Sequence, residues 1–151
     1  MERLINLLCW ATLSMSAHES RNPQSYMKHR APRALATCRE VGRRAHHVGL
    51  NPVEVIAVSW KESRHTRGIV GGAGEVGPLQ ALPKYWARKH DKDHITAGLR
   101  AWGYYRKKSR SIQEAAGKYN GGGPSSRYAV DVAELVSDLE LLAYVSRWPS
   151  R

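Results

Sequence analysis

The chain has 151 residues, 42% of them hydrophobic and 25% charged, a composition typical of one soluble globular domain. Its 24 Lys and Arg against 13 Asp and Glu give a formal net charge of +11, which favours polyanionic partners such as nucleic acid, anionic lipid or the acidic bacterial wall. Two cysteines without a CxxC or HExxH pattern argue against a metal cluster, so we expect neither a metal nor another cofactor.

Residues 1–17 carry one arginine before a mostly apolar run that closes on small residues. This pattern resembles a secretory signal peptide, and the alternative is an amphipathic helix that packs against the protein or a membrane surface. A disulfide between Cys9 and Cys38 requires that this segment stays on the chain and folds against the domain. Two unpaired thiols are the preferred interpretation.

Residues 18–33 contain two prolines and no sustained apolar period, which predicts a linker. Apolar residues then recur at intervals of three and four over residues 34–48, which predicts the first core helix. We therefore expect the domain to span residues 34–151.

Asn51 and Pro52 are a typical N-cap and first helical residue, and they predict a helix that ends near Glu62. Glu62 lies four residues after Val58 and continues an apolar face. A carboxyl group that is partly shielded from water has a raised pKa, as a general acid near neutral pH requires.

Five glycines predict that residues 64–79 form an irregular loop, with a small hairpin as the alternative. Pro83 predicts the start of a short helix that ends near His90, and Asp93 predicts the N-cap of the next helix.

Ser111 and Glu114 predict a capping box for a helix that ends at Tyr119, and the last helix is expected over residues 127–147. No segment alternates as a strand does. The predicted fold class is therefore all-α.

Three short motifs occur in a set order along the predicted domain. They are Glu62-Ser63 at a helix end, Gly-Glu-Val-Gly-Pro-Leu-Gln ending at Gln80, and Tyr119-Asn120-Gly121. In order and spacing they resemble the lytic transglycosylases of the soluble-lytic-transglycosylase, goose-type-lysozyme-like family, over roughly residues 39–136. The resemblance implies a lysozyme-like helical domain whose glycine-rich loop lines a sugar-binding cleft.

The resemblance also implies a role for each matching residue. Glu62 matches the single catalytic acid/base, which cleaves the bond between N-acetylmuramic acid and N-acetylglucosamine and leaves a 1,6-anhydro sugar. The substrate-binding residues implied are Ser63, in a supporting role, together with Gln80, Tyr119 and Asn120.

The sequence departs from the family pattern at several positions, among them His65 in place of a usual aromatic residue. Glu75 is the only other acidic residue between Glu62 and Gln80. It either holds the loop, which we prefer, or acts as a second carboxyl that would permit hydrolysis.

The expected partners are peptidoglycan glycan strands in the bacterial periplasm. The enzyme would open the wall locally for a phage virion or for a bacterial secretion or conjugation machine. It would reach the periplasm as part of the virion or through the signal-like N-terminus. Other proteins of the virion or of the secretion apparatus are further expected partners. Peripheral membrane contact through residues 1–17 stays open, and nucleic acid is a less favoured partner. The alternatives are a non-catalytic structural, DNA-binding or wall-binding component, or a hydrolytic lysozyme.

Overall fold

The computed structural model describes residues 1–91 and 93–147, and within this part the chain is mostly helical and contains no strand. The all-α prediction is confirmed. Residues 148–151 of the predicted domain lie outside the described residues. The helices are α1 (Glu2–Glu19), α2 (Pro23–Ser25), the π-helical turn η1 (Tyr26–Arg30), α3 (Ala31–His47), α4 (Pro52–Ser63), α5 (Pro83–Trp86), α6 (His94–Lys107), α7 (Ile112–Tyr119) and α8 (Arg127–Val145).

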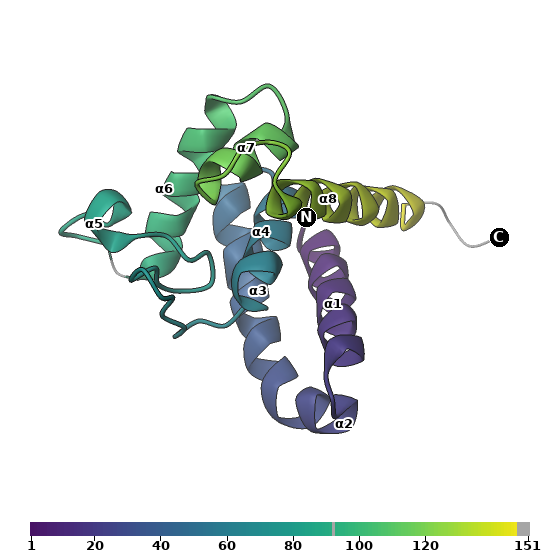
Figure 1. Ribbon diagram of the computed structural model, residues 1–151. Coiled ribbons are helices and arrows are strands. Elements are labelled where there is room, and N and C mark those ends of the chain that lie inside the picture. Colours follow the sequence, from purple (N-terminus) through teal and green to yellow (C-terminus); the bar gives the residue numbers. More distant parts are fainter. Residues whose placement is uncertain (92, 148–151) are drawn as a thin grey trace.

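Helix α4 lies at the centre of the hydrophobic core, where it packs against α1, α3 and α8 (Figure 1). Its residues Val55, Ile56 and Val58 are fully buried. Helix α6 adds Trp102 to the same core and packs against α5 and α7. The last turn of α4 is thereby fixed in the middle of the molecule.

Helix α1 packs along α3 and α4 and buries Ile5, Leu8 and Leu13 (Figure 1). Cys9 and Cys38 form a disulfide, so the preference for unpaired thiols was wrong. The physical reason is that both residues lie on the buried faces where α1 meets α3, with their Cα atoms 5.8 Å apart. None of the helices in the described part combines the length and hydrophobicity needed to cross a membrane.

The stretch at residues 18–33, predicted as a linker, holds α2, η1 and the first turn of α3. Its two prolines begin helices: Pro23 follows the N-cap Asn22, and Pro32 lies in the first turn of α3. Pro23 loses no helical hydrogen bond, because the first N–H groups of a helix have no partner within it, and Pro32 follows directly on the π-helical turn η1. Helix α3 consequently starts at Ala31, three residues earlier than predicted.

The predicted helix starts at the N-caps Asn51, Asp93 and Ser111 are confirmed, and each side chain accepts a hydrogen bond from a first-turn N–H. Helix α5 is shorter than predicted and ends at Trp86. The Trp86 carbonyl accepts a hydrogen bond from the Arg100 guanidinium, where a continued helix would use a backbone N–H.

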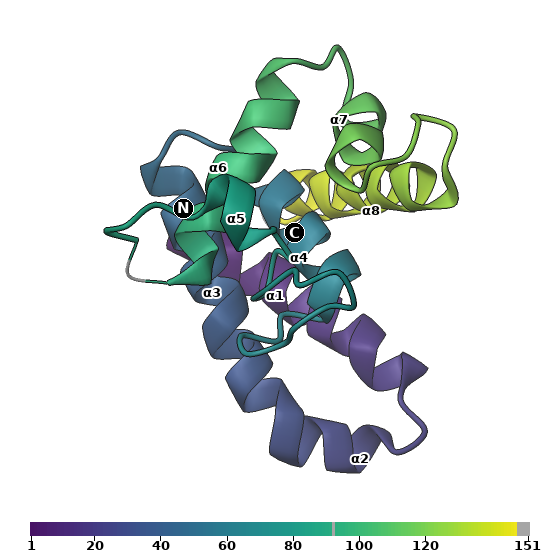
Figure 2. The same cartoon turned by 60° about the vertical axis from the view of Figure 1, so that its left-hand side comes forward.

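The long loop between α4 and α5 (Figure 2) makes two isolated β-bridges, from Val76 to Val70 and to Ala81. No regular hairpin forms in it.

We expect Gly117→Ala to destabilise the protein by about 1–3 kcal/mol, measured by urea unfolding. A Cβ atom added to Gly117, in α7, would lie 2.5 Å from the Gly123 carbonyl oxygen, which is backbone and cannot turn aside. The matched change Gly103→Ala meets only the flexible tip of Leu50, at 3.3 Å, and should be neutral or stabilising by up to about 1 kcal/mol. Equal effects of the two changes would contradict this close contact.

Candidate active site

Glu62 lies in the last turn of α4 and faces a cleft of about 480 Å³. The cleft is formed by the loop after α4, by α5 and α6, and by the C-terminal end of α7. Its lining includes four of the residues predicted from the sequence: Glu62, Gln80, Tyr119 and Asn120. Glu75 lines the same cleft.

Burial raises the pKa of Glu62 from 4.5 to about 7. The Tyr128 hydroxyl, from α8, donates a hydrogen bond of 2.5 Å to Glu62 Oε1 and opposes this rise in pKa. The negative charge of Glu75 raises the pKa of Glu62 further, and Lys61 lowers it. The pKa of Glu62 is therefore raised into the range of neutral pH, where the side chain can both give and accept a proton.

Tyr128 was missed as a site residue by the sequence analysis. It is the second residue of α8, 66 positions after Glu62, and belongs to none of the three motifs. Burial raises the pKa of its phenol well above the usual value, so the hydroxyl remains a donor. Only the packing of α8 against α4 brings the two side chains together.

Tyr119 lies at the end of α7 and is partly buried in the cleft wall. Its hydroxyl donates a hydrogen bond to the Leu79 carbonyl, which holds α7 against the glycine-rich loop. Asn120, the C-cap of α7, is exposed at the rim of the cleft. At the end of α7, Tyr119 thus forms part of the cleft wall and Asn120 forms a polar edge of the cleft.

Gln80 adopts a left-handed backbone conformation, with φ of +46°. Its side-chain amide donates hydrogen bonds to the carbonyls of Gly77 and Ile69, at 2.8 and 3.2 Å, and so stabilises the loop. A Cβ atom added at Gly71 would lie 2.5 Å from the Glu75 carboxylate and 2.7 Å from the Gln80 amide oxygen, so both side-chain ends lie against Gly71. Both polar groups therefore share one face of the loop, on the cleft.

Glu75 has the loop contact that we preferred for it, because its Oε2 accepts a hydrogen bond from the Ala73 N–H at 3.0 Å. It also acts on Glu62 through its charge.

Ser63 is buried and is absent from the cleft lining. Its hydroxyl donates to the carbonyls of Ser59 and Pro78 and accepts from the Thr66 N–H. Ser63 thus connects the end of α4 to the loop, and the structure gives it the supporting position rather than contact with a ligand.

Aromatic side chains form the far wall of the cleft. Trp86 and Tyr105, which the sequence analysis did not assign to a site, line it together with the exposed Tyr85. The ring centroids of Trp86 and Tyr105 are 5.6 Å apart, in an edge-to-face arrangement. None of these aromatic residues belongs to the three motifs that predicted the site.

His65 is fully buried directly after α4, where its ring nitrogens hydrogen-bond to Thr12 of α1 and Ser59 of α4, each at 2.9 Å. Burial and the charge of Arg64 lower the pKa of His65 to about 3, so the ring is neutral. It connects the N-terminal helix to the end of α4 that carries Glu62.

No family model, curated protein or solved structure matches the chain. Within residues 1–91 and 93–147, no three His, Cys, Asp or Glu side chains gather in a way that could hold a metal ion. The geometry around Glu62 is therefore the basis for a functional proposal.

Proposed function

We propose that the protein is a peptidoglycan lytic transglycosylase with a lysozyme-like domain and that Glu62 is its catalytic acid/base. The observation that carries this proposal is a carboxyl group with a pKa near 7 in a cleft lined by Gln80, Tyr119 and Asn120. A group that must first give and then take a proton works best when its pKa lies near the working pH.

In the proposed reaction, protonated Glu62 gives its proton to the glycosidic oxygen as the bond from that oxygen to the muramyl anomeric carbon breaks. The resulting carboxylate accepts the proton of the muramyl 6-hydroxyl while the hydroxyl oxygen bonds to the anomeric carbon. The products are a 1,6-anhydromuramyl end and a free N-acetylglucosamine 4-hydroxyl. Glu62 ends protonated, and no water is consumed.

The surroundings of Glu62 favour this reaction over hydrolysis. A hydrolase normally uses a second carboxyl as base or nucleophile. Glu75, the other carboxyl that lines the cleft, is bound to the backbone of its own loop. A substrate that supplies its own nucleophile removes the need for a second base.

The setting we propose is the bacterial periplasm, with delivery by a phage virion or a secretion or conjugation machine. The net charge of +11 supports binding to an acidic wall polymer.

Mass spectrometry of soluble products from purified peptidoglycan tests the reaction. We expect muropeptides with 1,6-anhydro ends. Products heavier by one water, with reducing ends, would instead indicate hydrolysis and a role for Glu75. An absence of products would favour a non-catalytic wall-binding or DNA-binding component, which salt-sensitive DNA binding would then support.

Two substitutions should move the pH dependence of kcat/KM in opposite directions. Tyr128→Phe removes a hydrogen bond that lowers the pKa of Glu62, so the loss of activity at high pH should shift to higher pH. Glu75→Gln removes a negative charge that raises the pKa of Glu62, so the loss of activity at high pH should shift to lower pH. Both profiles can be measured between about pH 5 and pH 9. Shifts in the same direction would exclude Glu62 as the titrating acid.

A further inference from the structure

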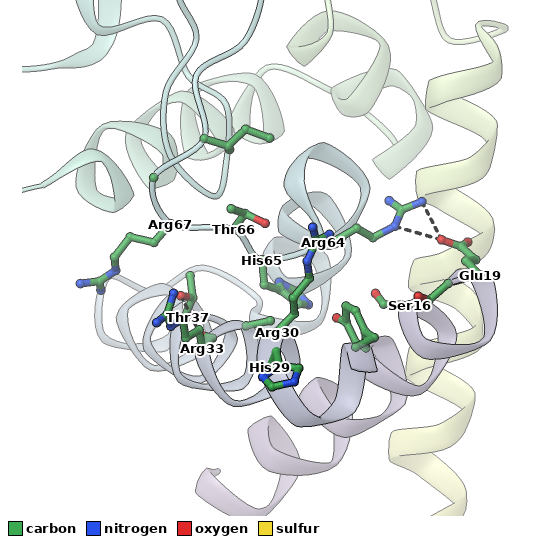
Figure 3. A pocket seen from close by; sticks show the side chains of 15 residues that line it. Ser16, Glu19, His29, Arg30, Arg33, Thr37, Arg64, His65, Thr66 and Arg67 are labelled. Carbon is green, nitrogen blue, oxygen red and sulfur yellow. Dashed lines mark hydrogen bonds and ion pairs between the residues drawn. The ribbon is translucent and has the colours of Figure 1, made fainter. Parts of the chain in front are cut away.

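A second cavity, of about 740 Å³, lies on the other side of the chain segment that leaves α4. The end of α1, the η1–α3 junction and the turn at residues 64–69 form its walls (Figure 3). Four arginines line it: Arg30, Arg33, Arg64 and Arg67. Among the described residues that line it, Glu19 is the only one with a carboxylate. We call this space the basic cavity.

Among the described residues, two of these arginines form an ion pair with a carboxylate and two do not. Arg64 pairs with Glu19 at 3.1 Å, and Arg67 pairs with Glu40. In the part of the chain that the structure describes, the guanidinium groups of Arg30 and Arg33 have no carboxylate partner and no hydrogen-bond acceptor. The basic cavity therefore has two unpaired cations on one wall.

A buried hydroxyl group lies on that same wall. Tyr26 and Arg30, from η1, and Arg33, from the first turn of α3, all line the basic cavity. The Tyr26 Oη atom is buried and has no hydrogen-bond partner among the described residues. A buried donor beside two unpaired guanidinium groups is suited to an anionic acceptor.

The backbone around the basic cavity is also unusual on both sides. Arg64 and His65 both adopt left-handed conformations, with φ of +53° and +61°, which are unfavourable for residues other than glycine. Residues 26–30 form a π-helical turn. Strained residues and π-helical turns are both frequent at functional sites.

We propose that the basic cavity binds a compact anion with two or more acid groups, either phosphate or carboxylate. Guanidinium groups bind both kinds of oxyanion through paired N–H donors. A single acid group would leave one of the two unpaired arginines unused. Among residues 1–91 and 93–147, none lines both this cavity and the cleft of Glu62, so the site is separate from the proposed catalytic one.

Isothermal titration calorimetry at low ionic strength tests the proposal, with inorganic pyrophosphate and citrate as probes. We expect binding that weakens about tenfold or more in Arg30→Gln/Arg33→Gln and about three- to tenfold in Tyr26→Phe. Both arginines are exposed, so the double variant should fold. The control Lys107→Gln/Arg110→Gln removes the same charge at exposed positions of another region and should weaken binding by no more than about twofold.

Binding of both probes supports a general oxyanion site, and binding of pyrophosphate or citrate alone identifies the acid group as phosphate or carboxylate. The proposal is overturned if neither probe binds, or if the two double variants weaken binding equally, because the net charge alone would then be responsible. Release of muropeptides is a separate measurement, so failure here leaves the proposed reaction intact.

Discussion

Replacement of Glu62 by glutamine should lower the release of anhydro-muropeptides by about 10²–10⁴-fold, the usual contribution of a general acid/base. Glutamine keeps the shape of the side chain and accepts the hydrogen bond from Tyr128, but it cannot transfer the proton. The release rate from purified peptidoglycan measures the effect.

The same substitution should stabilise the fold above pH 7. The pKa of Glu62 is about 7 in the folded protein and 4.5 without its surroundings, so between these values the folded state binds more protons than the unfolded state. The free energy of unfolding contributed by Glu62 therefore falls as pH rises from 4.5 to 7. Removal of the ionisable group should restore about 3 kcal/mol at pH 8, measured by urea unfolding.

Glu134→Gln is the matched control, because Glu134 is an exposed carboxylate of α8 that lies outside the cleft. It should leave the release rate unchanged. If Glu62→Gln kept full activity, Glu62 would not be the acid. If it destabilised the protein at pH 8, the raised pKa would be contradicted.

Loss of the disulfide should destabilise the protein by about 3–4 kcal/mol and lower its Tm by roughly 10 °C. The bond joins residues 29 positions apart and restricts the unfolded chain over that loop. Activity should fall too, because α1 supplies the Thr12 hydroxyl that contacts His65 behind the end of α4.

Differential scanning calorimetry with and without a thiol reductant measures this effect, and Cys9→Ala/Cys38→Ala serves as the control. The variant should start at the lower Tm and be insensitive to the reductant. A reductant that left the wild-type Tm unchanged while opening the disulfide would show that α1 is held by packing alone.

Local chemistry explains what the sequence predicted well. The N-caps Asn51, Asp93 and Ser111 act on N–H groups two or three residues away, so neighbouring residues are sufficient to place the helix starts. Glu62 was found by the same kind of reasoning, since its position on an apolar helix face predicts a partly buried carboxyl group.

Contacts between distant segments explain what was missed. Tyr128 is 66 residues from Glu62, and Cys9 and Cys38 meet only because α1 packs on α3. The basic cavity likewise combines residues from α1, η1, α3 and the turn after α4. Neither the spacing of residues in the sequence nor their hydrophobic periodicity predicts contacts between such distant segments. Prolines were misinterpreted for a different reason, because the same residue begins a helix or ends one according to its position.

The fluorescence of two tryptophans, Trp86 and Trp60, should report ligand binding at two different places. Trp86 lines the cleft of Glu62, whereas Trp60 stacks against the guanidinium group of Arg64, which lines the basic cavity and lies 3.8 Å from the Trp60 ring centroid. A sugar in the cleft and an anion in the basic cavity would therefore perturb the fluorescence of different tryptophans. A variant that keeps only one of these two tryptophans would therefore follow one kind of ligand and not the other.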